Sequence, residues 1–371
     1  MRITDVALTP LYLPFRQPYH WAGRVDHGAA VVLVEVTTDD GLVGVGESTA
    51  PLPAGATLAA LRAVTPLFVG EPACEIERLL GRARHLGGFN HTPWWANLVL
   101  AGLEMALWDV AGKSAGRPVH QLLGGRVRDE VDYFGFVQGD TAPQLAEHAA
   151  SLAAGGHEVL YLKVGRGEAA DLANTAAVRK AIGDRRLRLD ANGAWDVAEA
   201  IAMIGKLERF DPDWIEQPTQ PLSLAALRQV KEAVRVAIAA DQAAFTPEDV
   251  YDICRQGAAD AIVLSVHETG GLLAFGKAAA IAAAAGIPIC LHGQSVSGIT
   301  DAAQQHVGLC TGNLTSGNQI MHQLLEEDLV SAPCLTPVRG RIGTPEGPGF
   351  GVELDRDAVA RAAERYDKLG R

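Results

Sequence analysis

The first 50 residues alternate between apolar and polar positions, which is the period of a β-strand with one buried face. The alternation is clear on both sides of Asp39-Asp40-Gly41, a sequence typical of a hairpin turn. Residues 56–125 follow a helical period instead. The strongest helix is predicted over 94–113, with one apolar face made of Leu100, Leu103, Leu107 and Val110.

From about residue 130 short apolar runs alternate with helical stretches, as in βα units that build a parallel sheet. A first strand is predicted near 131–134, a helix over 142–154, and a weak eighth strand near 314–321. The six strands between them end 24 to 27 residues apart, on Lys163, Asp190, Glu216, Asp241, Ser265 and His292. One strand, one helix and two loops take about that many residues, so the spacing indicates a βα barrel.

Composition narrows the class of protein. With 371 residues and 48% apolar residues, the chain is long enough for a barrel and a second domain. A net charge of −12 without a basic stretch argues against nucleic-acid binding. Five scattered cysteines predict reduced thiols and a cytoplasmic protein. The start has no secretory run, and the Ala-rich stretch 278–285 is too short to span a membrane.

Three of the strand ends are acidic. In a parallel barrel the carboxyl ends of the strands share one rim, so Asp190, Glu216 and Asp241 are predicted to face one another there. Three converging carboxylates repel unless a cation lies between them, and an all-oxygen set suits Mg²⁺. The competing interpretation is that each caps a helix or pairs with arginine, but three at matched spacing favour the metal site.

Lys163 precedes these carboxylates by one strand. We expect a lysine that is partly desolvated near a metal to have a lowered pKa and to act as a base. A metal that binds a substrate carboxylate acidifies its α-proton and stabilises the enediolate that forms. The alternative role of Lys163 is a salt bridge to Glu216 or Asp190.

Several motifs together resemble the mandelate racemase and muconate lactonizing enzyme group of the enolase superfamily. They are Leu162-Lys163-Val164-Gly165, Leu189-Asp190-Ala191-Asn192-Gly193, Trp214-Ile215-Glu216-Gln217-Pro218, Ala240-Asp241-Gln242, Gly270-Gly271, Ala106-Leu107-Trp108-Asp109 and Gly347-Pro348-Gly349. The resemblance spans nearly the whole chain. It implies an α/β fold, a modified TIM barrel (β/α)₇β over 126–339, with an N-terminal α+β capping domain over 1–125 completed by 340–371. It also implies Mg²⁺ at the three carboxylates and abstraction of an α-proton from a small carboxylate substrate.

The chain departs from the family pattern at the acid/base positions. The family often carries Lys-x-Lys on the second strand, and here the first lysine is Tyr161, which either bonds a carboxylate or only packs. On strand six, Ser265 stands where the group has a lysine or a histidine-orienting Asp. His292 on strand seven is therefore the predicted second acid/base, with Ser265 able to bond its ring. His267 either reaches the same opening or lies at an exposed turn.

The remaining candidates are substrate-binding residues. Asn318 is a candidate replacement for the family's acidic residue on strand eight. Asn192 and Gln217 lie beside predicted ligands and are candidates for orienting them. In the loop around His20, Arg24 is a candidate for binding a distal anion, and Trp21 for an apolar or cationic portion of the substrate.

Two reactions fit a lysine and a histidine on opposite faces. The sequence slightly favours dehydration, in which Lys163 takes the α-proton and His292 protonates a departing β-hydroxyl. The alternative is racemisation or epimerisation, in which His292 returns the proton to the other face. Cycloisomerisation and metal binding without turnover are further alternatives. By analogy with the family we expect a homo-oligomer.

Overall fold

The N-terminal part of the computed structural model is an antiparallel sheet. The structure describes residues 1–21, 24–49, 53–332 and 335–369. Three strands pair in the order β1-β2-β3: β1 Ile3–Trp21, β2 Arg24–Thr38 and β3 Val43–Thr49. The predicted hairpin is confirmed, and Gly41 takes a left-handed φ of 82° in its turn. The segment 20–24, expected as a loop, instead contains the ends of β1 and β2, while Ala22 and Gly23 lie outside the described residues.

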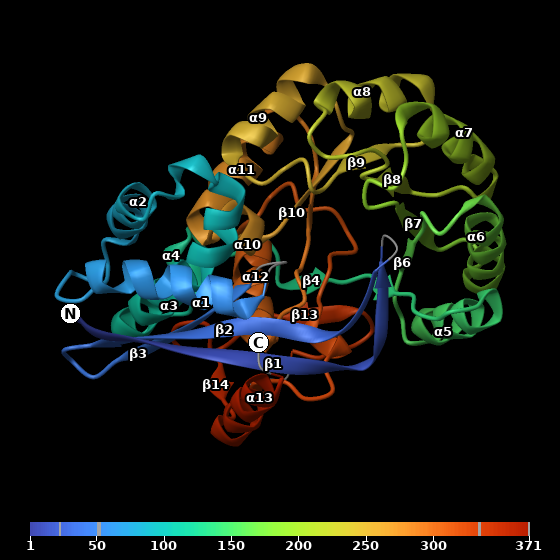
Figure 1. Cartoon of the computed structure of the whole chain (residues 1–371). Coiled ribbons are helices and arrows are strands. Elements are labelled where there is room, and N and C mark those ends of the chain that lie inside the picture. Colours follow the sequence, from blue (N-terminus) through green and yellow to red (C-terminus); the bar gives the residue numbers. More distant parts are fainter. Residues whose placement is uncertain (22–23, 50–52, 333–334, 370–371) are drawn as a thin grey trace.

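Helices cover one face of this sheet (Figure 1). The helices in contact with it are α1 Ala54–Val64 and α3 Pro93–Ala115. Near them lie η1 Thr65–Leu67, α2 Ile76–Leu86 and η2 Phe89–His91, while α4 Val119–Leu122 packs against α3 and α12. The helix α3 contains the helix predicted over 94–113, and its backbone packs very close to that of β3. A Cβ placed on Gly46 would lie 2.0 Å from the carbonyl oxygen of Gly102, so this contact requires glycine.

The parallel sheet follows in the predicted order of strand and helix. Its strands lie side by side in the order β11-β10-β9-β8-β7-β6-β5. They are β5 Gly135–Phe136, β6 Val159–Lys163, β7 Arg186–Asp190, β8 Trp214–Glu216, β9 Ile238–Ala240, β10 Ala261–Leu264 and β11 Ile289–Leu291. The helices around the outside are α5 Ala142–Ala154, α6 Glu168–Ile182, α7 Val197–Leu207, α8 Leu224–Ala233, α9 Pro247–Gln256, α11 Leu272–Ala284 and α12 Gly298–Cys310 (Figure 1). The short, buried helix α10 Val266–Thr269 packs against α3 and α11.

The ring closes without a regular eighth strand. The segment 314–319 bridges β11 through Leu314 and the stretch before β5 through Asn318. The predicted first strand is split: β4 Glu130–Asp132 pairs with β13 Arg341–Gly343, and only β5 joins the barrel. The short elements η3 Glu208–Phe210, η4 His322–Leu324, β12 Val330–Ala332 and β14 Glu353–Leu354 complete the fold.

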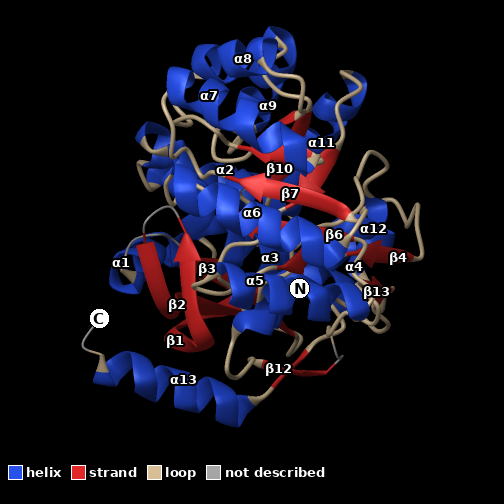
Figure 2. Ribbon diagram, turned by 90° about the vertical axis from the view of Figure 1, so that its right-hand side faces the viewer, coloured by secondary structure: helices blue, strands red, loops and turns tan. Residues whose placement is uncertain are grey.

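The C-terminal helix α13 Arg356–Lys368 returns to the N-terminal sheet and packs against β1, apart from the barrel helices (Figure 2). This fits the expectation that residues 340–371 complete the capping domain, although the domain boundaries stay a prediction. Among the described residues, no helix combines the length and apolar character needed to cross a bilayer.

Candidate active site at the rim of the barrel

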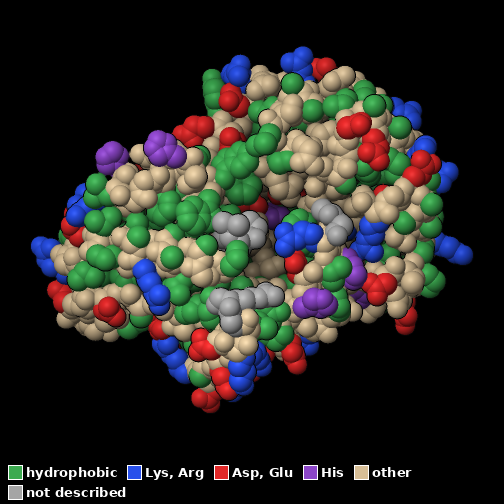
Figure 3. Space-filling model, in the orientation of Figure 1, with side chains coloured by type: hydrophobic (Ala, Val, Ile, Leu, Met, Phe, Trp, Pro, Cys, Tyr) green, Lys and Arg blue, Asp and Glu red, His purple; other side chains and the backbone are tan. Residues whose placement is uncertain are grey.

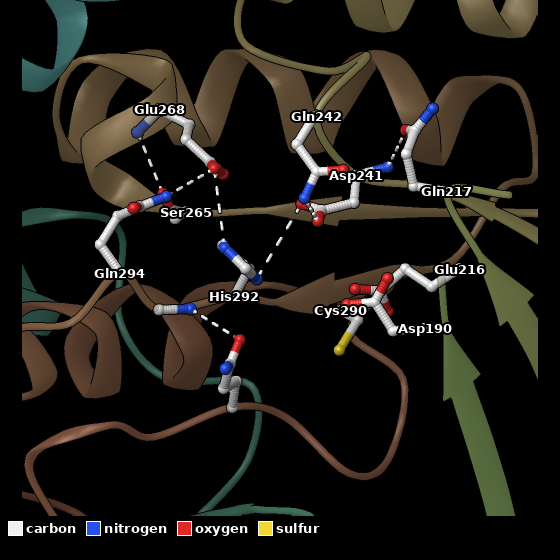
Figure 4. Close-up of polar contacts among 12 residues, drawn as sticks. Asp190, Glu216, Gln217, Asp241, Gln242, Ser265, Glu268, Cys290, His292 and Gln294 are labelled. Atoms are coloured by element: carbon white, nitrogen blue, oxygen red, sulfur yellow. Dashed lines mark hydrogen bonds and ion pairs between the residues drawn. The ribbon is translucent and has the colours of Figure 1, made fainter. Parts of the chain in front are cut away.

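The three predicted carboxylates come together at one end of the parallel sheet. Asp190 and Glu216 end β7 and β8 and are partners in the strand register, and Asp241 follows β9 directly. All three are buried (Figure 4). Burial, followed by the charge of Asp190, raises the pKa of Asp241 to about 8 and that of Glu216 well above its usual value. The three carboxylates therefore repel one another when ionised, and a cation bound between them would reduce this repulsion.

The side chains do not form a symmetric trio. Glu216, Asp241 and His292 each offer one ligand atom, and these atoms lie within 4.8 Å of one another. The carboxylate of Asp190 turns instead toward Tyr161 and Lys163, and it accepts the Asn192 N–H at 2.7 Å. One oxygen of Asp241 (Oδ1) is buried without a hydrogen-bond partner. An unpartnered carboxylate oxygen among hard oxygen donors is the arrangement that Mg²⁺ fits.

Lys163 ends β6, next to Asp190 in the register. Its buried ammonium donates to Asp190 and, at 2.7 Å, to Asn192 Oδ1. Burial opposes the charge, but the attraction of Asp190, together with Tyr19 and Glu216, outweighs it and raises the pKa of Lys163. The fall in this pKa that the sequence suggests concerns a lysine beside a bound metal, and it stays a prediction.

Tyr161 both bonds a carboxylate and packs. Its hydroxyl lies 2.7 Å from Glu216 Oε1 and also contacts Asp190. Its ring stacks on Phe134 at 4.4 Å between centroids, with 4° between the planes. Among the orienting residues, Asn192 bonds Lys163 as described, and Gln217 Oε1 accepts the Asp241 N–H at 3.0 Å.

His292 lies on the far side of the carboxylates from Lys163. Its Nδ1 is 3.9 Å from Asp241 Oδ1, and its Nε2 is 3.6 Å from Glu268 Oε1 (Figure 4). Burial lowers the pKa of the imidazole, against the opposing attraction of Glu268. Sequence reasoning missed Glu268, a buried carboxylate whose Oε1 accepts from Gln294 at 2.8 Å.

Ser265 does not bond the imidazole ring of His292. It is the N-cap of α10, and its Oγ accepts the Glu268 N–H at 3.0 Å. The sequence contains the signal for this turn, because Ser-x-x-Glu is typical of a helix N-terminus and puts the glutamate one turn beyond the serine. The carboxylate beside His292 therefore comes from α10 and not from the strand-six position.

Two of the candidates, one histidine and one amide, lie away from the opening. His267 is fully buried, not at an exposed turn, and its Nε2 lies 2.6 Å from the carbonyl oxygen of Glu47 in β3. The Asn318 amide is occupied by backbone groups: it accepts from Leu291 and donates to the carbonyls of Asp132 and Thr315. Its neighbour Gln319 lies closer to the site, and its Oε1 accepts the N–H of Gly293, next to His292, at 3.2 Å.

The space-filling view shows a hollow in this face of the molecule, with Lys or Arg side chains beside it (Figure 3). The two cap candidates lie at the ends of β1 and β2. The Trp21 Nε1 donates to Asp26 at 2.6 Å, and the Arg24 guanidinium lies 5.1 Å from the Trp21 ring centre. Arg24 also pairs with Asp26 at 3.6 Å and is exposed. Both are held by partners on their own hairpin, and their roles toward a substrate stay predictions.

Family models match both parts of the chain. The mandelate racemase / muconate lactonizing enzyme N-terminal domain matches residues 3–124, and the enolase C-terminal domain-like model matches residues 144–358. The chain belongs to the enolase superfamily. This assignment confirms the family resemblance and the fold class deduced from the sequence.

Relatives of this superfamily member include isomerases. Muconate cycloisomerase 1 of Rhodococcus opacus is 32% identical over 379 residues, covering 97% of this chain and 98% of that protein. The muconate lactonizing enzyme of Pseudomonas fluorescens, solved with muconolactone, is 29% identical with a TM-score of 0.91, and the match covers 97% and 99% of the two chains. A dipeptide epimerase of Enterococcus faecalis, solved with Mg and L-Leu-L-Tyr, is 26% identical with a TM-score of 0.89 over 95% and 100%.

Proposed function

We propose that this protein racemises or epimerises a small carboxylate, with Lys163 and His292 acting on opposite faces of the α-carbon. The supporting observation is the position of the two groups. Lys163 lies on β6, adjacent to the first carboxylate strand, and His292 follows β11, beyond the last. A substrate carboxylate held over the acidic residues between them has its α-carbon within reach of a base on either side. The relatives include epimerases and cycloisomerases, which favours this alternative over dehydration.

The residues that would hold Mg²⁺ are Asp190, Glu216 and Asp241. Two observations support this set: the carboxylates are buried and repel one another, and one oxygen of Asp241 has no hydrogen-bond partner. A bound divalent ion stabilises negative charge on a substrate carboxylate. Gln217, by accepting the Asp241 backbone N–H, fixes the position from which that carboxylate projects.

The protein's own groups set the direction of proton movement. The Asn192 Oδ1 and the Asp190 carboxylate orient the Lys163 side chain, which in its neutral form removes the proton on its side. On the other side Glu268 faces the His292 Nε2 at 3.6 Å, so a proton held by the imidazole is stabilised by a carboxylate. Gln294 and the Glu268 backbone N–H, bonded to Ser265, hold Glu268 in this position.

Deuterium exchange tests the proposal directly. A panel of amino-acid derivatives and sugar acids is incubated in D₂O with Mg²⁺, and recovered substrate is analysed for α-deuterium and for configuration. We expect inverted, α-deuterated substrate. Lys163→Ala should abolish the exchange of at least one enantiomer, and His292→Asn should abolish inversion. Unchanged exchange in Lys163→Ala would refute the proposal, and a 2-keto acid product would establish dehydration instead.

Cycloisomerisation is the second candidate, favoured by the muconate cycloisomerases among the relatives. It uses the same α-carbon chemistry on a conjugated diacid. Loss of the diene absorbance of muconate, with no α-deuterium in recovered non-conjugated substrates, would identify it.

A further inference from the structure

The N-terminal sheet and the helices on it, which we call the cap, contact the barrel through the buried Glu47 of β3. The Glu47 carboxylate accepts the Ser297 N–H at 3.0 Å, the Ser297 hydroxyl at 2.5 Å and the Thr300 hydroxyl at 3.1 Å. Ser297 is the N-cap of α12. All three side chains are at most 1% exposed, so these bonds are shielded from water. A carboxylate of the cap thus holds the first turn of a barrel helix.

The backbone of Glu47 contacts a second barrel segment. Its carbonyl oxygen lies 2.6 Å from the Nε2 of His267 in α10, and a carbonyl oxygen can only accept, so this nitrogen carries the proton. The next residue of α10 is Glu268, the carboxylate that faces His292 (Figure 4). Glu47 is therefore bonded to both segments that surround His292, namely α10 and the stretch from β11 into α12.

The helix α10 depends on the cap for its position. It is only four residues long, and a helix of this length is not stable without outside contacts. Asn97 of α3 donates from its Nδ2 to the carbonyl oxygen of Glu268 at 2.7 Å. The carboxylate of Glu104, also in α3, accepts the N–H groups of Leu272 and Leu273 at 2.9 and 3.0 Å. The cap therefore holds both this turn and the start of the next helix.

The loop between β11 and α12 supplies another partner of Glu268. His292 begins this loop, and its N–H donates to a backbone carbonyl of β10 at 2.8 Å. Gln294, two residues further on, donates to Glu268 Oε1 at 2.8 Å. The far end of the loop is Ser297, which Glu47 holds. The barrel thus fixes the start of the loop, and the cap fixes its end.

We propose that Glu47 is a positioning residue through which the cap sets the separation of Glu268 and His292. Its carbonyl oxygen holds the turn that carries Glu268, and its carboxylate holds the loop that carries His292 and Gln294. The inference rests on the proposed function for its catalytic consequence, an effect on the His292 side of the substrate and none on the Lys163 side. The contacts themselves are testable without any substrate.

The catalytic test follows α-proton exchange of the two enantiomers separately, with the substrate found by deuterium exchange. Glu47→Gln keeps the size of the side chain but leaves a single acceptor oxygen for the N–H and the two hydroxyls. We expect exchange of the enantiomer deprotonated by His292 to fall about tenfold to a hundredfold, as for a misplaced catalytic group. Exchange of the enantiomer deprotonated by Lys163 should be nearly unchanged, because its partners Asp190 and Asn192 belong to the barrel.

Asp109→Asn is the matched control. Asp109 is another buried carboxylate of the cap, and it accepts the N–H groups of Val45 at 2.9 Å and Phe350 at 2.8 Å, neither of which belongs to α10 or to the loop after β11. We expect this variant to lower Tm without changing the ratio of the two exchange rates. The ratio therefore separates positioning from a general loss of stability. Lys163→Ala and His292→Asn identify the enantiomer that each base deprotonates.

Backbone hydrogen exchange of the metal-free protein, followed by mass spectrometry, tests the contacts without a substrate. In Glu47→Gln we expect peptides covering 292–300 to exchange about threefold to tenfold faster, the factor that corresponds to one hydrogen bond. His267→Phe removes the bond to the Glu47 carbonyl oxygen instead. It should speed exchange over 264–272 and lower α-proton exchange on the same side of the substrate as Glu47→Gln. Peptides covering 163–170, after β6, should exchange as in the wild type in both variants.

Each outcome decides a different point. An equal loss of α-proton exchange for both enantiomers in Glu47→Gln, or an unchanged ratio, would overturn the inference and leave the proposed function standing. Backbone exchange over 292–300 as slow as in the wild type would overturn it as well. If the wild-type protein exchanges no α-proton of any substrate while backbone exchange changes as expected, the positioning contacts are established and the proposed function fails.

Discussion

Replacing Arg188 by methionine should destabilise the barrel strongly. Arg188 is fully buried in β7, two residues before Asp190. Its Nε donates to Asp213 at 2.9 Å, its Nη2 to the Ser316 carbonyl at 2.5 Å and its Nη1 to the Gly317 carbonyl, while its guanidinium lies 3.5 Å from the Trp214 ring centre. The side chain thus ties the segment that closes the barrel to the strand that carries a predicted metal ligand.

The magnitude follows from the groups that lose their partner. The buried Gly317 carbonyl oxygen loses its main donor and keeps only Cys290 Sγ at 3.4 Å, which costs about 1 to 3 kcal/mol. Ser316 is exposed, so water replaces the donor to its carbonyl oxygen. A desolvated cation–π contact adds about 2 kcal/mol. Methionine keeps part of the packing and removes the cost of burying a charge, so the net loss should be about 3 to 5 kcal/mol, the range for breaking a buried ion pair. Asp213 keeps a second partner, Arg186, at 2.7 Å.

Thermal unfolding followed by circular dichroism measures this loss. At about 2 °C per kcal/mol, Arg188→Met should lower Tm by about 6 to 10 °C. The matched control is Arg186→Met, on the same strand and the same carboxylate but 42% exposed, which should change stability by less than about 1 kcal/mol. Equal Tm values for the two variants would refute the reasoning that the buried Gly317 carbonyl and the Trp214 ring depend on Arg188.

Two further predictions concern protons and metal. Burial lowers the pKa of His306, which accepts from the His120 N–H, to about 4, below the unfolded value of about 6.5. The unfolded chain therefore takes up the proton first, and the folded protein loses up to about 3 kcal/mol as pH falls from 6.5 to 4. Because His306→Gln lacks this titration, its Tm deficit relative to wild type should shrink over that range, and a constant deficit would contradict the assignment. For the metal, Asp241→Asn should weaken Mg²⁺ binding in calorimetric titration by at least about tenfold to a hundredfold. Asp252→Asn, at an exposed position on α9, should not, and an equal affinity in both variants would exclude Asp241 as a ligand.

The alternation of apolar runs and the regular spacing of strand ends were sufficient to predict the barrel. In a parallel βα fold the carboxyl ends of the strands share one rim, so residues that end successive strands must be neighbours. Lys163, Asp190 and Glu216 are register partners for this reason, and the sequence alone placed them together. The helix over 142–154 and the hairpin at Asp39–Gly41 were also predicted, since local propensity and turn chemistry determine both.

The sequence did not predict the contacts of side chains whose positions depend on a loop or on a second secondary-structure element. Asn318 and Gln319 are adjacent, and only the path of the closing segment decides that Asn318 bonds the backbone of Leu291 and Gln319 that of Gly293, next to His292. His267 was expected near the opening or at an exposed turn, but α10 directs it into the contact with β3.

By itself the sequence determined the fold class and which side chains meet at the barrel rim, because a period of two or 3.6 residues and a fixed βα repeat act over short distances along the chain. Only the tertiary structure decided that Glu268 faces His292 and that His267 is buried against β3. Both contacts join segments far apart in the sequence or beyond a turn, and their geometry depends on how the cap and the barrel rim pack together.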